Sequence, residues 1–542
     1  MKNTLKFIAI LATASLALSS CIKETFPEGG TATSEQVGES SSALKASLNG
    51  IPAQMVQGYL VYGSQTHETD MAFPGTMIAM TEMLGDMYPL GSNSGYDWYR
   101  AYNVCTGMGD NSYPSYLTWF TFYQFIKANN DVIASVDIED PEVGADLKGM
   151  AGVAYACRAF NYYMLTVLFE PVENVYTDIS KVKGLTVPFV TEKTDGEISK
   201  NNPRQKHEDM IAFIISDLEK AEACLKEYTP DSGLFPSLPV VYGIRAKVHM
   251  WDEDYANAAK YARMAITAHG GAPVSKAQWL DPTSAFNTAN QAWMWYGHYS
   301  AENMGNLCNF IGWVNGENDW GYASLTNPSI DRSLYNKYGE NDFRRLSFYD
   351  STVDYDYHCA RGNDFLEGHD MLALKFRCKE ANWEDYAVGA AVDVPFMRVE
   401  EMYLIEAEAI GMTNGLEAGI QALNSFVTTY RDPDYSCKAK ELRDFQLAVL
   451  DQTRLEFWGE GWGFPNAKRL KPNVIQNYEG TNAPDASFQI NCKGIKPNWN
   501  MVIPKFEYQS NKAIDGWNNP DPSGVIATTP TPVGTFAAGQ YE

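Results

Sequence analysis

The sequence has little histidine and lacks the short motifs that mark the common catalytic sites. It contains 7 His among 542 residues, and His207-Glu208 has no second His at the spacing of a zinc peptidase. No Walker A sequence and no intact Gly-x-Gly-x-x-Gly occurs, and the nearest match to a Gly-x-Ser-x-Gly elbow, residues 91–95, has Asn at its centre. We therefore expect a non-enzymatic protein with no catalytic residue, no metal and no cofactor. A glycosidase needs only two carboxylates, so a surface glycoside hydrolase stays open as an alternative.

Cysteine is present but not in the arrangement of a metal site or a redox motif. The chain has 9 Cys, none in a Cys-x-x-Cys pair and none at zinc-finger spacing from a His. Cys157 and Cys224 fall within helical patterns, where a packed thiol is expected. Cys359 and Cys378 can form a disulfide in an exported protein, but the sequence leaves the pairing open.

Basic residues are scarce relative to acidic ones. The 42 Lys and Arg stand against 67 Asp and Glu, which gives a formal net charge of −25. Such a surface repels phosphate backbones, so we expect no nucleic-acid partner.

Only one long apolar run occurs, and it lies at the start of the chain. Residues 7–18 follow Lys2 and Lys6 and have the length of a signal-peptide core, too short to span a bilayer. The run ends in Leu18-Ser19-Ser20-Cys21, which looks like a bacterial lipobox. We predict a lipoprotein signal peptide over residues 1–20, lipidation (diacylglycerol, palmitate) at Cys21, and a tether over 21–32. The protein is then anchored to a membrane rather than inserted in it.

What the chain has in abundance is helical periodicity, which predicts a mainly α-helical domain over residues 33–542. A capping box at residues 33–36 precedes apolar residues on one face, and residues 119–136 and 147–169 repeat this spacing. Asn202-Pro203 predicts the cap and first position of another helix. The apolar stripe of that helix comprises Ile211, Ile214, Ile215, Leu218, Ala221 and Leu225.

Two adjacent helices resemble a tetratricopeptide unit. Residues 240–251 are followed at once by 252–268, in which Tyr255, Ala258 and Ala262 recur every three or four positions. A second pair covers 394–412 and 416–430, and a further helix covers 439–460. We predict a tetratricopeptide-like helical scaffold over 33–269 and 394–470, completed by a wrapping tail over 471–542.

Between the two halves of the scaffold, residues 270–393 form a loop-rich insertion with many aromatic, Asn, Asp and Gly residues. A long irregular segment in a compact domain is usually functional. Trp and Tyr rings can cover the apolar face of a sugar while polar side chains bond its hydroxyls. The stretches "GYDWYRAYN" (95–103) and "NGENDWGY" (315–322) combine these residue types. Each ring can instead plug the core under a loop. The candidate ligand contacts are Asp97, Trp98, Tyr99, Tyr296, Asn318, Asp319, Trp320 and Tyr322.

Several motifs stand in order along nearly the whole chain. These motifs comprise Trp119, Tyr123, Ile126 and Asn129; Gly149 and Ala151; Arg158, Ala159, Tyr162 and Leu165; Asp217, Leu218 and Ala221; Pro395, Arg398, Glu401, Leu404, Ala407, Glu408 and Ala409; Arg454, Glu456, Phe457, Glu460, Gly461, Lys468 and Arg469; Ile503, Pro504, Glu507 and Asn511. In this order and spacing they resemble the SusD/RagB family of nutrient-binding outer-membrane lipoproteins.

The resemblance implies a SusD-like fold and a surface-exposed protein on the outer membrane. It implies capture of a glycan and its delivery to a TonB-dependent transporter of the SusC type. A peptide ligand is the main alternative within the family, and a lipid-anchored adaptor that binds only protein is another reading.

The charged residues on the predicted 394–412 helix can also be interpreted without the family resemblance. Arg398, Glu401 and Glu408 lie on one helical face, where unpaired charges against a core would be costly. We expect them to form structural ion pairs, with Arg454 or Arg469 as partners, rather than an acid–base pair.

Overall fold

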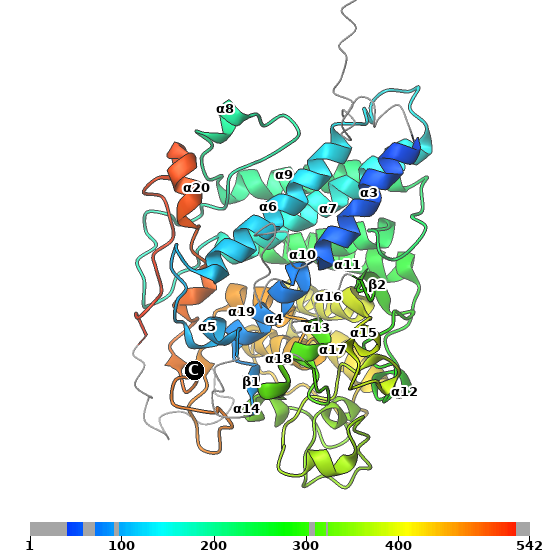
Figure 1. Cartoon of the computed structure of the whole chain (residues 1–542), viewed down its shortest axis with the longest axis vertical. Coiled ribbons are helices and arrows are strands. Elements are labelled where there is room, and N and C mark those ends of the chain that lie inside the picture. The colour runs from blue at the N-terminus through cyan, green and yellow to red at the C-terminus, as the bar shows by residue number, and fades with distance from the viewer. Residues whose placement is uncertain (1–40, 58–70, 91–96, 303–308, 321–322, 527–542) are drawn as a thin grey trace, which may run out of the picture.

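The computed structural model describes residues 41–57, 71–90, 97–302, 309–320 and 323–526, and shows a mainly α-helical protein (Figure 1). The main helices are α3 (Ser41–Val56), α4 (Ala72–Leu84), α6 (Tyr113–Ile133), α7 (Ala145–Phe169), α9 (His207–Leu225), α10 (Leu238–Trp251), α11 (Tyr255–His269), α16 (Val399–Asn414), α17 (Leu416–Tyr430), α18 (Leu442–Glu456) and α19 (Gly463–Leu470). The short helices are α5 (Arg100–Val104), α8 (Gly196–Ser199), α12 (Lys276–Trp279), α13 (Phe310–Val314), α14 (Arg332–Tyr335), α15 (Tyr386–Gly389) and α20 (Lys505–Ser510).

Successive long helices pack side by side and form the predicted scaffold. α6 packs on α7, α7 on α9, α9 on α10, α10 on α11, α11 on α16 and α16 on α17. The tetratricopeptide-like pair is α10 and α11. Asp254 caps α11 by accepting a hydrogen bond from the Asn257 N–H, and Ala258 and Ala262 are fully buried between neighbouring helices. The prediction of a mainly α, tetratricopeptide-like fold is confirmed.

Two predicted helix boundaries are wrong, for the same physical reason. Asn202-Pro203 does not begin α9, which starts at His207, because the preceding residues are held in an extended conformation. The Arg204 Nε donates to the Thr186 carbonyl at 2.7 Å, and Lys206 forms a bridge to Leu185. Likewise residues 394–398 are a strand, and α16 begins at Val399. Pairing with distant residues overrides the local helical pattern in both places.

Three two-stranded antiparallel sheets join distant parts of the chain: β1 (Met87–Pro89) with β3 (Pro328–Ile330), β2 (Trp293–His298) with β4 (Asp393–Arg398), and β5 (Val474–Ile475) with β6 (Asn491–Cys492). The β2–β4 pair lies near the two ends of the 270–393 segment and closes it as one long loop on the scaffold. Irregular stretches and 3-10 turns fill that loop, namely η1 (Ala323–Leu325), η2 (Phe343–Ser347), η3 (Asn363–Leu366) and η4 (Lys379–Ala381); η5 (Pro497–Trp499) and η6 (Lys512–Ile514) lie in the C-terminal segment.

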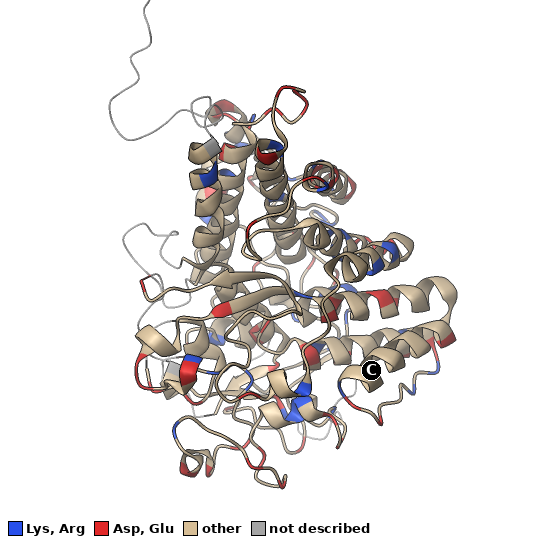
Figure 2. Ribbon diagram, turned by 90° about the vertical axis from the view of Figure 1, so that its right-hand side faces the viewer, with Lys and Arg blue, Asp and Glu red and all other residues tan. Residues whose placement is uncertain are grey.

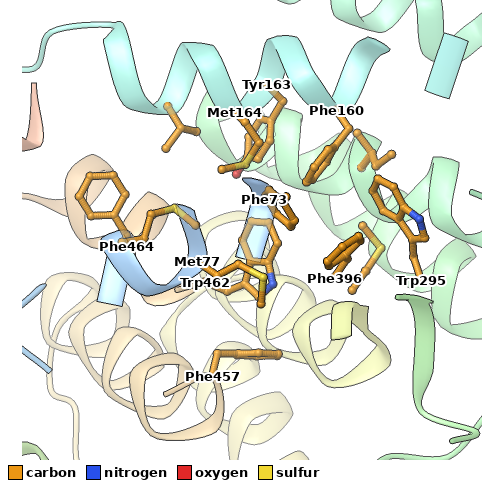
Figure 3. Packing of buried hydrophobic residues seen from close by; sticks show 14 of the residues in the cluster. Phe73, Met77, Phe160, Tyr163, Met164, Trp295, Phe396, Phe457, Trp462 and Phe464 are labelled. Atoms are coloured by element: carbon orange, nitrogen blue, oxygen red, sulfur yellow. The ribbon is translucent and has the colours of Figure 1, made fainter. Parts of the chain in front are cut away.

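The core is centred on α4, all of whose residues are buried (Figure 3). The Phe73 ring lies 4.9 Å from that of Phe396 on β4 and 5.3 Å from that of Phe160 on α7, both edge-on. Phe160 in turn meets Trp295 on β2 at 4.9 Å. These edge-to-face contacts tie the scaffold to the base of the long loop, so the loop-rich region rests on a rigid support.

The charged motif forms buried ion pairs, as predicted, with partly different partners. Glu408 accepts from Arg469 Nη2 at 2.7 Å, which confirms one expected partner. Arg454 pairs instead with Asp86, and Glu401 pairs with Lys247 Nζ at 2.6 Å.

Arg398 pairs with Glu456 at the end of α18 and with Glu460 in the turn between α18 and α19. Its Nη1 lies 3.0 Å from Glu456 Oε1, and its Nε lies 2.9 Å from Glu460 Oε2. Arg431 and Arg344 also contact Glu456, and these three cations hold the pKa of the Glu456 carboxyl well below its usual range. Each of these charges has a partner of opposite charge inside the core, so the cluster consists of structural ion pairs.

Charged residues are spread along the ribbon of helices and loops, with Lys and Arg positions among those of Asp and Glu (Figure 2). Among the described residues, no helix is long and apolar enough to cross a membrane. The cysteines that the structure describes, Cys359 and Cys378 among them, are free thiols. Cys21 and its flanking segments lie outside the described residues.

Candidate ligand-binding cavity

An open cavity of about 710 Å³ lies beside Trp98, at the N-terminal end of α6. Its volume falls within the roughly 300–1,000 Å³ typical of small-ligand sites. Three parts of the chain surround it: the start of α5, the loop before α6, and the C-terminal segment. The lining residues are Trp98, Ala101, Tyr102, Gly107, Gly109, Asp110, Asn111, Ser112, Tyr113, Pro114, Asp521 and Ser523.

The loop that forms one wall owes its path to two glycines and a helix cap. Gly107 has φ +62°, a conformation that side chains rarely adopt. A Cβ at Gly109 would overlap the Asp521 carboxylate. Ser112 then caps α6 by accepting from the Ser115 N–H, and Pro114 occupies the first turn. Tyr113 therefore projects from the helix start with 54% of its surface exposed.

The C-terminal segment is fastened to this loop and forms the opposite wall. Ser523 Oγ accepts from the Met108 N–H at 3.0 Å, and the Cys105 thiol lies 3.6 Å from the Pro522 carbonyl. The Asp521 carboxylate accepts from the Ser523 N–H at 2.8 Å, which fixes its orientation. The cavity is thus pre-formed, so ordering its walls would cost little free energy on ligand binding.

The chemistry of the cavity is that of rings beside hydrogen-bonding groups. The half-buried indole of Trp98 and the exposed phenol of Tyr113 supply flat apolar faces. Asp110, Asn111 and Asp521 supply acceptors and an amide donor around them. This combination suits a neutral polyhydroxylated ligand, which has apolar C–H faces and a rim of hydroxyls.

The structure brings two of the predicted ligand-contact stretches together, at α13. The Tyr99 ring lies 5.2 Å from that of Trp313 on α13, edge-on. Trp320 Nε1 donates to Asn309 Oδ1, at the cap of the same helix, at 3.4 Å. Tyr99 and Trp320 are 1% and 5% exposed, so both rings fill space beneath the loops in this conformation.

The remaining predicted residues are dispersed. Asn318 is buried and its Nδ2 donates to the Asn315 carbonyl at 2.8 Å, whereas Asp319 is exposed and lies 3.5 Å from Arg361 Nη1. Tyr296 is half-buried on β2, which Figure 1 places far across the molecule from α5. Tyr322 lies outside the described residues. The role of all these residues as ligand contacts stays a prediction.

Asp97 lies directly before the cavity residue Trp98. Burial raises the pKa of its carboxyl to about 6, although the backbone N–H groups of Tyr99 and Arg100 favour the charged form. Within the part of the chain that the structure describes, no group of three or more His, Cys, Asp or Glu is placed to hold a metal ion.

Trp98 is the one lining residue of this cavity that was predicted from the sequence as a ligand contact. The stretch "GDNSYP" (109–114) carries the same mixture of ring, Asn and Asp that singled out the other loops, and could have been named with them. Asp521 and Ser523 carried no such signal, because only the return of the C-terminal segment brings them to the loop before α6.

The structure thus combines a helical array with an open cavity lined by rings and polar groups. Known proteins with similar sequence or fold are as follows. Residues 59–249 match the SusD-like family described as "Starch-binding associating with outer membrane". A SusD-like protein of Formosa agariphila, named P2, is 23% identical over 397 residues, which are 69% of this chain and 73% of that protein.

Solved structures share the fold. A SusD-like carbohydrate binding protein from Bacteroides vulgatus superposes with a TM-score of 0.68 at 19% identity, over 87% of this chain and 96% of that one. Surface glycan-binding protein A from Bacteroides thetaiotaomicron, in complex with laminarihexaose, superposes with a TM-score of 0.61 at 14% identity, over 87% and 98% of the two chains. The SusD-like family model thus matches residues 59–249, and the shared fold extends the likeness to SusD-like proteins over most of the chain.

Proposed function

We propose that this protein is a non-enzymatic surface lipoprotein that captures a glycan in the Trp98 cavity. The observation that carries the proposal is the pairing of two accessible rings, Trp98 and Tyr113, with a rim of carboxylates and amides around one pre-formed cavity. The names of the relatives agree with it, since one is a carbohydrate binding protein and another was solved with laminarihexaose.

The protein then acts at the outer membrane, anchored through lipidated Cys21, and delivers its glycan to a TonB-dependent transporter of the SusC type. Support for the location comes from the family description, which names outer-membrane association, and from the lipobox-like residues 18–21. A Cys21→Ser change should abolish palmitate incorporation in cells and release the protein from the membrane fraction. Delivery predicts that detergent-solubilised protein co-purifies with a TonB-dependent transporter.

The first experiment is a calorimetric screen of residues 22–542 against polysaccharides and peptides, repeated with Trp98→Ala and Tyr113→Ala. We expect binding of one glycan class without turnover, weakened at least about fivefold by Trp98→Ala, because a ring that covers a sugar contributes about 1 kcal/mol or more. Tyr113 is exposed, so its replacement tests the cavity without disturbing the core.

A matched control is Trp517→Ala. Trp517 is 43% exposed and its ring lies 4.8 Å from Lys181 Nζ, outside the residues that line the cavity. Glycan binding that survives both cavity changes but not this one would contradict the proposed site. Peptide binding instead of glycan binding would point to the alternative within the family, and binding of protein alone to an adaptor. Turnover abolished by Asp110→Asn or Asp521→Asn would point to a hydrolase.

A further inference from the structure

The Trp98 cavity continues into a second cavity of about 460 Å³ between α6 and α20. The two cavities share Asp110, Asn111, Ser112 and Tyr113, so the exposed Tyr113 ring stands at the passage from one to the other. Beyond the shared residues, the second cavity is lined by Tyr116, Lys505, Phe506 and Gln509. A groove thus leads away from Trp98 along one edge of α6.

Half-buried aromatic rings line this groove. Tyr116 and Phe120 stack in parallel, with ring centroids 5.5 Å apart and planes 7° apart. Phe506, on α20, meets Tyr116 edge-on at 4.9 Å and Phe120 at 6.1 Å. Because Tyr113, Tyr116 and Phe120 are spaced by three and four positions, they follow one another along a single face of α6.

A third cavity of about 260 Å³ adjoins the second at Phe506 and adds polar groups. Its lining includes Glu507, whose carboxylate accepts from Trp119 Nε1 at 3.3 Å, and Asn511, whose Nδ2 donates to the Asn202 carbonyl at 2.6 Å. Rings therefore alternate with fixed hydrogen-bonding groups over all three cavities.

The α20 wall of the groove is held in place by the same loop that shapes the Trp98 cavity. The Lys505 N–H donates to the Asp110 carbonyl at 2.9 Å, and the Tyr508 hydroxyl donates to the Asp110 carboxylate. The Asn202 N–H donates to Asn511 Oδ1 at 2.9 Å at the far end. The groove is pre-formed at both ends, so a ligand need not order it.

We propose that the groove between α6 and α20 binds the further sugar units of a linear glycan whose first units lie in the Trp98 cavity. This inference rests on the proposed function. It specifies the ligand class as a long chain, bound along its length across Trp98, Tyr113 and the Tyr116–Phe120–Phe506 cluster, rather than a short oligosaccharide.

A glycan fits this groove better than an extended peptide does. An extended peptide gains much of its affinity from main-chain pairing with a strand edge. Along the described groove the walls are the helices α6 and α20, which offer a peptide no strand edge. A glycan needs no strand edge, because rings cover its apolar faces and side chains reach its hydroxyls.

The test is a glycan array carrying length ladders of two to ten units of β-1,3-glucan, α-1,4-glucan, β-1,4-xylan and β-1,4-mannan. The measured quantity is the ratio of affinities for the longest and shortest members of the ladder that binds. Wild-type protein should favour the longest by about tenfold, since each further ring contact contributes a factor of about 2 to 10. Phe506→Ala should abolish this length gain and leave the affinity for the shortest binding member within about twofold.

The controls separate this inference from the proposed function. Trp98→Ala should weaken short and long members alike, and Trp517→Ala should change neither. Because Phe506→Ala can loosen the short helix α20, Tyr116→Ala on the long helix α6 repeats the test, and Phe506→Tyr should retain the gain. An unchanged length gain in Phe506→Ala and Tyr116→Ala would overturn the groove while leaving the Trp98 cavity standing. Absence of binding to every ladder would overturn both.

Discussion

Arg158 on α7 holds Asp217 on α9 by two hydrogen bonds inside the helical scaffold. Its Nε lies 2.7 Å from Asp217 Oδ2 and its Nη2 lies 2.9 Å from Asp217 Oδ1, with both side chains almost fully buried. The same guanidinium reaches Glu192 at 2.6 Å, in the loop between the two helices. This pair fixes the relative position of the helices on which α6 and its groove rest.

Removal of one partner of this pair should strongly destabilise the protein. Arg158→Met leaves the buried Asp217 carboxylate with only the more distant Lys220, whose Nζ lies 3.9 Å away, and we expect a loss of about 3–5 kcal/mol in the free energy of unfolding. Chemical denaturation of residues 22–542 measures this. The double change Arg158→Met with Asp217→Leu should cost less than the two single changes added together. A loss below about 1 kcal/mol for Arg158→Met would show that the pair has little structural role.

His207 should make the stability of the scaffold depend on pH. Its Nδ1 lies 2.9 Å from Glu170 Oε1 and its Nε2 lies 3.0 Å from Asp252 Oδ1, and hydrogen bonds to Asp252 and Glu170 raise the pKa of the imidazole from 6.5 to about 10. A pKa raised by folding stabilises the protein fully below pH 6.5, and this contribution is lost as the pH rises toward 10. His207→Gln should therefore cost about 1–3 kcal/mol at pH 6 and much less at pH 10.5.

Chemical denaturation of the wild-type protein and of His207→Gln at pH 6 and pH 10.5 tests this prediction. His298 provides a matched control, because it contacts a single carboxylate, Asp393, and is exposed. His298→Gln should have a small effect at either pH. An equal cost of His207→Gln at pH 6 and pH 10.5 would contradict the charged bridge.

Asp97 should make the stability of the protein depend on pH in the opposite direction to His207. Burial raises its pKa from 3.8 to about 6, so the ionised carboxylate destabilises the fold above pH 6, and this penalty disappears as the pH falls toward 3.8. Asp97→Asn should raise the free energy of unfolding by about 1–3 kcal/mol at pH 8 and leave it nearly unchanged at pH 4. Glycan affinity of the same variant gives an independent readout: a loss of binding at pH 8 with a stable fold would support the predicted contact role of Asp97.

Gly109 should be required for the wall of the Trp98 cavity. A methyl group there would overlap the Asp521 carboxylate and push that side chain from its place in the cavity wall. We expect Gly109→Ala to weaken glycan binding about threefold to tenfold, since a displaced wall no longer presents its polar rim, with little change in the thermal midpoint.

Gly144→Ala is the matched control for this change. Gly144 precedes α7 with φ −67°, and a Cβ there would meet nothing within 4 Å. Calorimetry on Gly109→Ala and Gly144→Ala measures the glycan affinity of each variant. Equal affinity of Gly109→Ala and wild type would place the ligand away from Asp521.

The helical scaffold can be predicted from the sequence alone. The prediction of residues 416–430 coincides with α17, and the tetratricopeptide-like pair became α10 and α11, because apolar spacing of three and four is a local property of the chain. The predicted helix starts at Asn202 and at residue 394 were wrong. Hydrogen bonds to residues 185–190 and to β2 hold these two segments in an extended conformation. The sequence also found Trp98, and it named Arg469 as a partner for the charged motif, because a buried charge must be paired wherever it lies.

Which aromatic rings remain accessible depends on long-range packing, which the sequence pattern does not show. Tyr99 and Trp320 have polar neighbours in sequence, yet the fold buries both against α13, whereas Tyr113 at the start of α6 stays open to solvent. The Trp98 cavity exists because residues 521–523 return to the loop before α6, more than 400 residues away in the chain. Local pattern carries no information about such a contact, since its position depends on how every intervening helix packs.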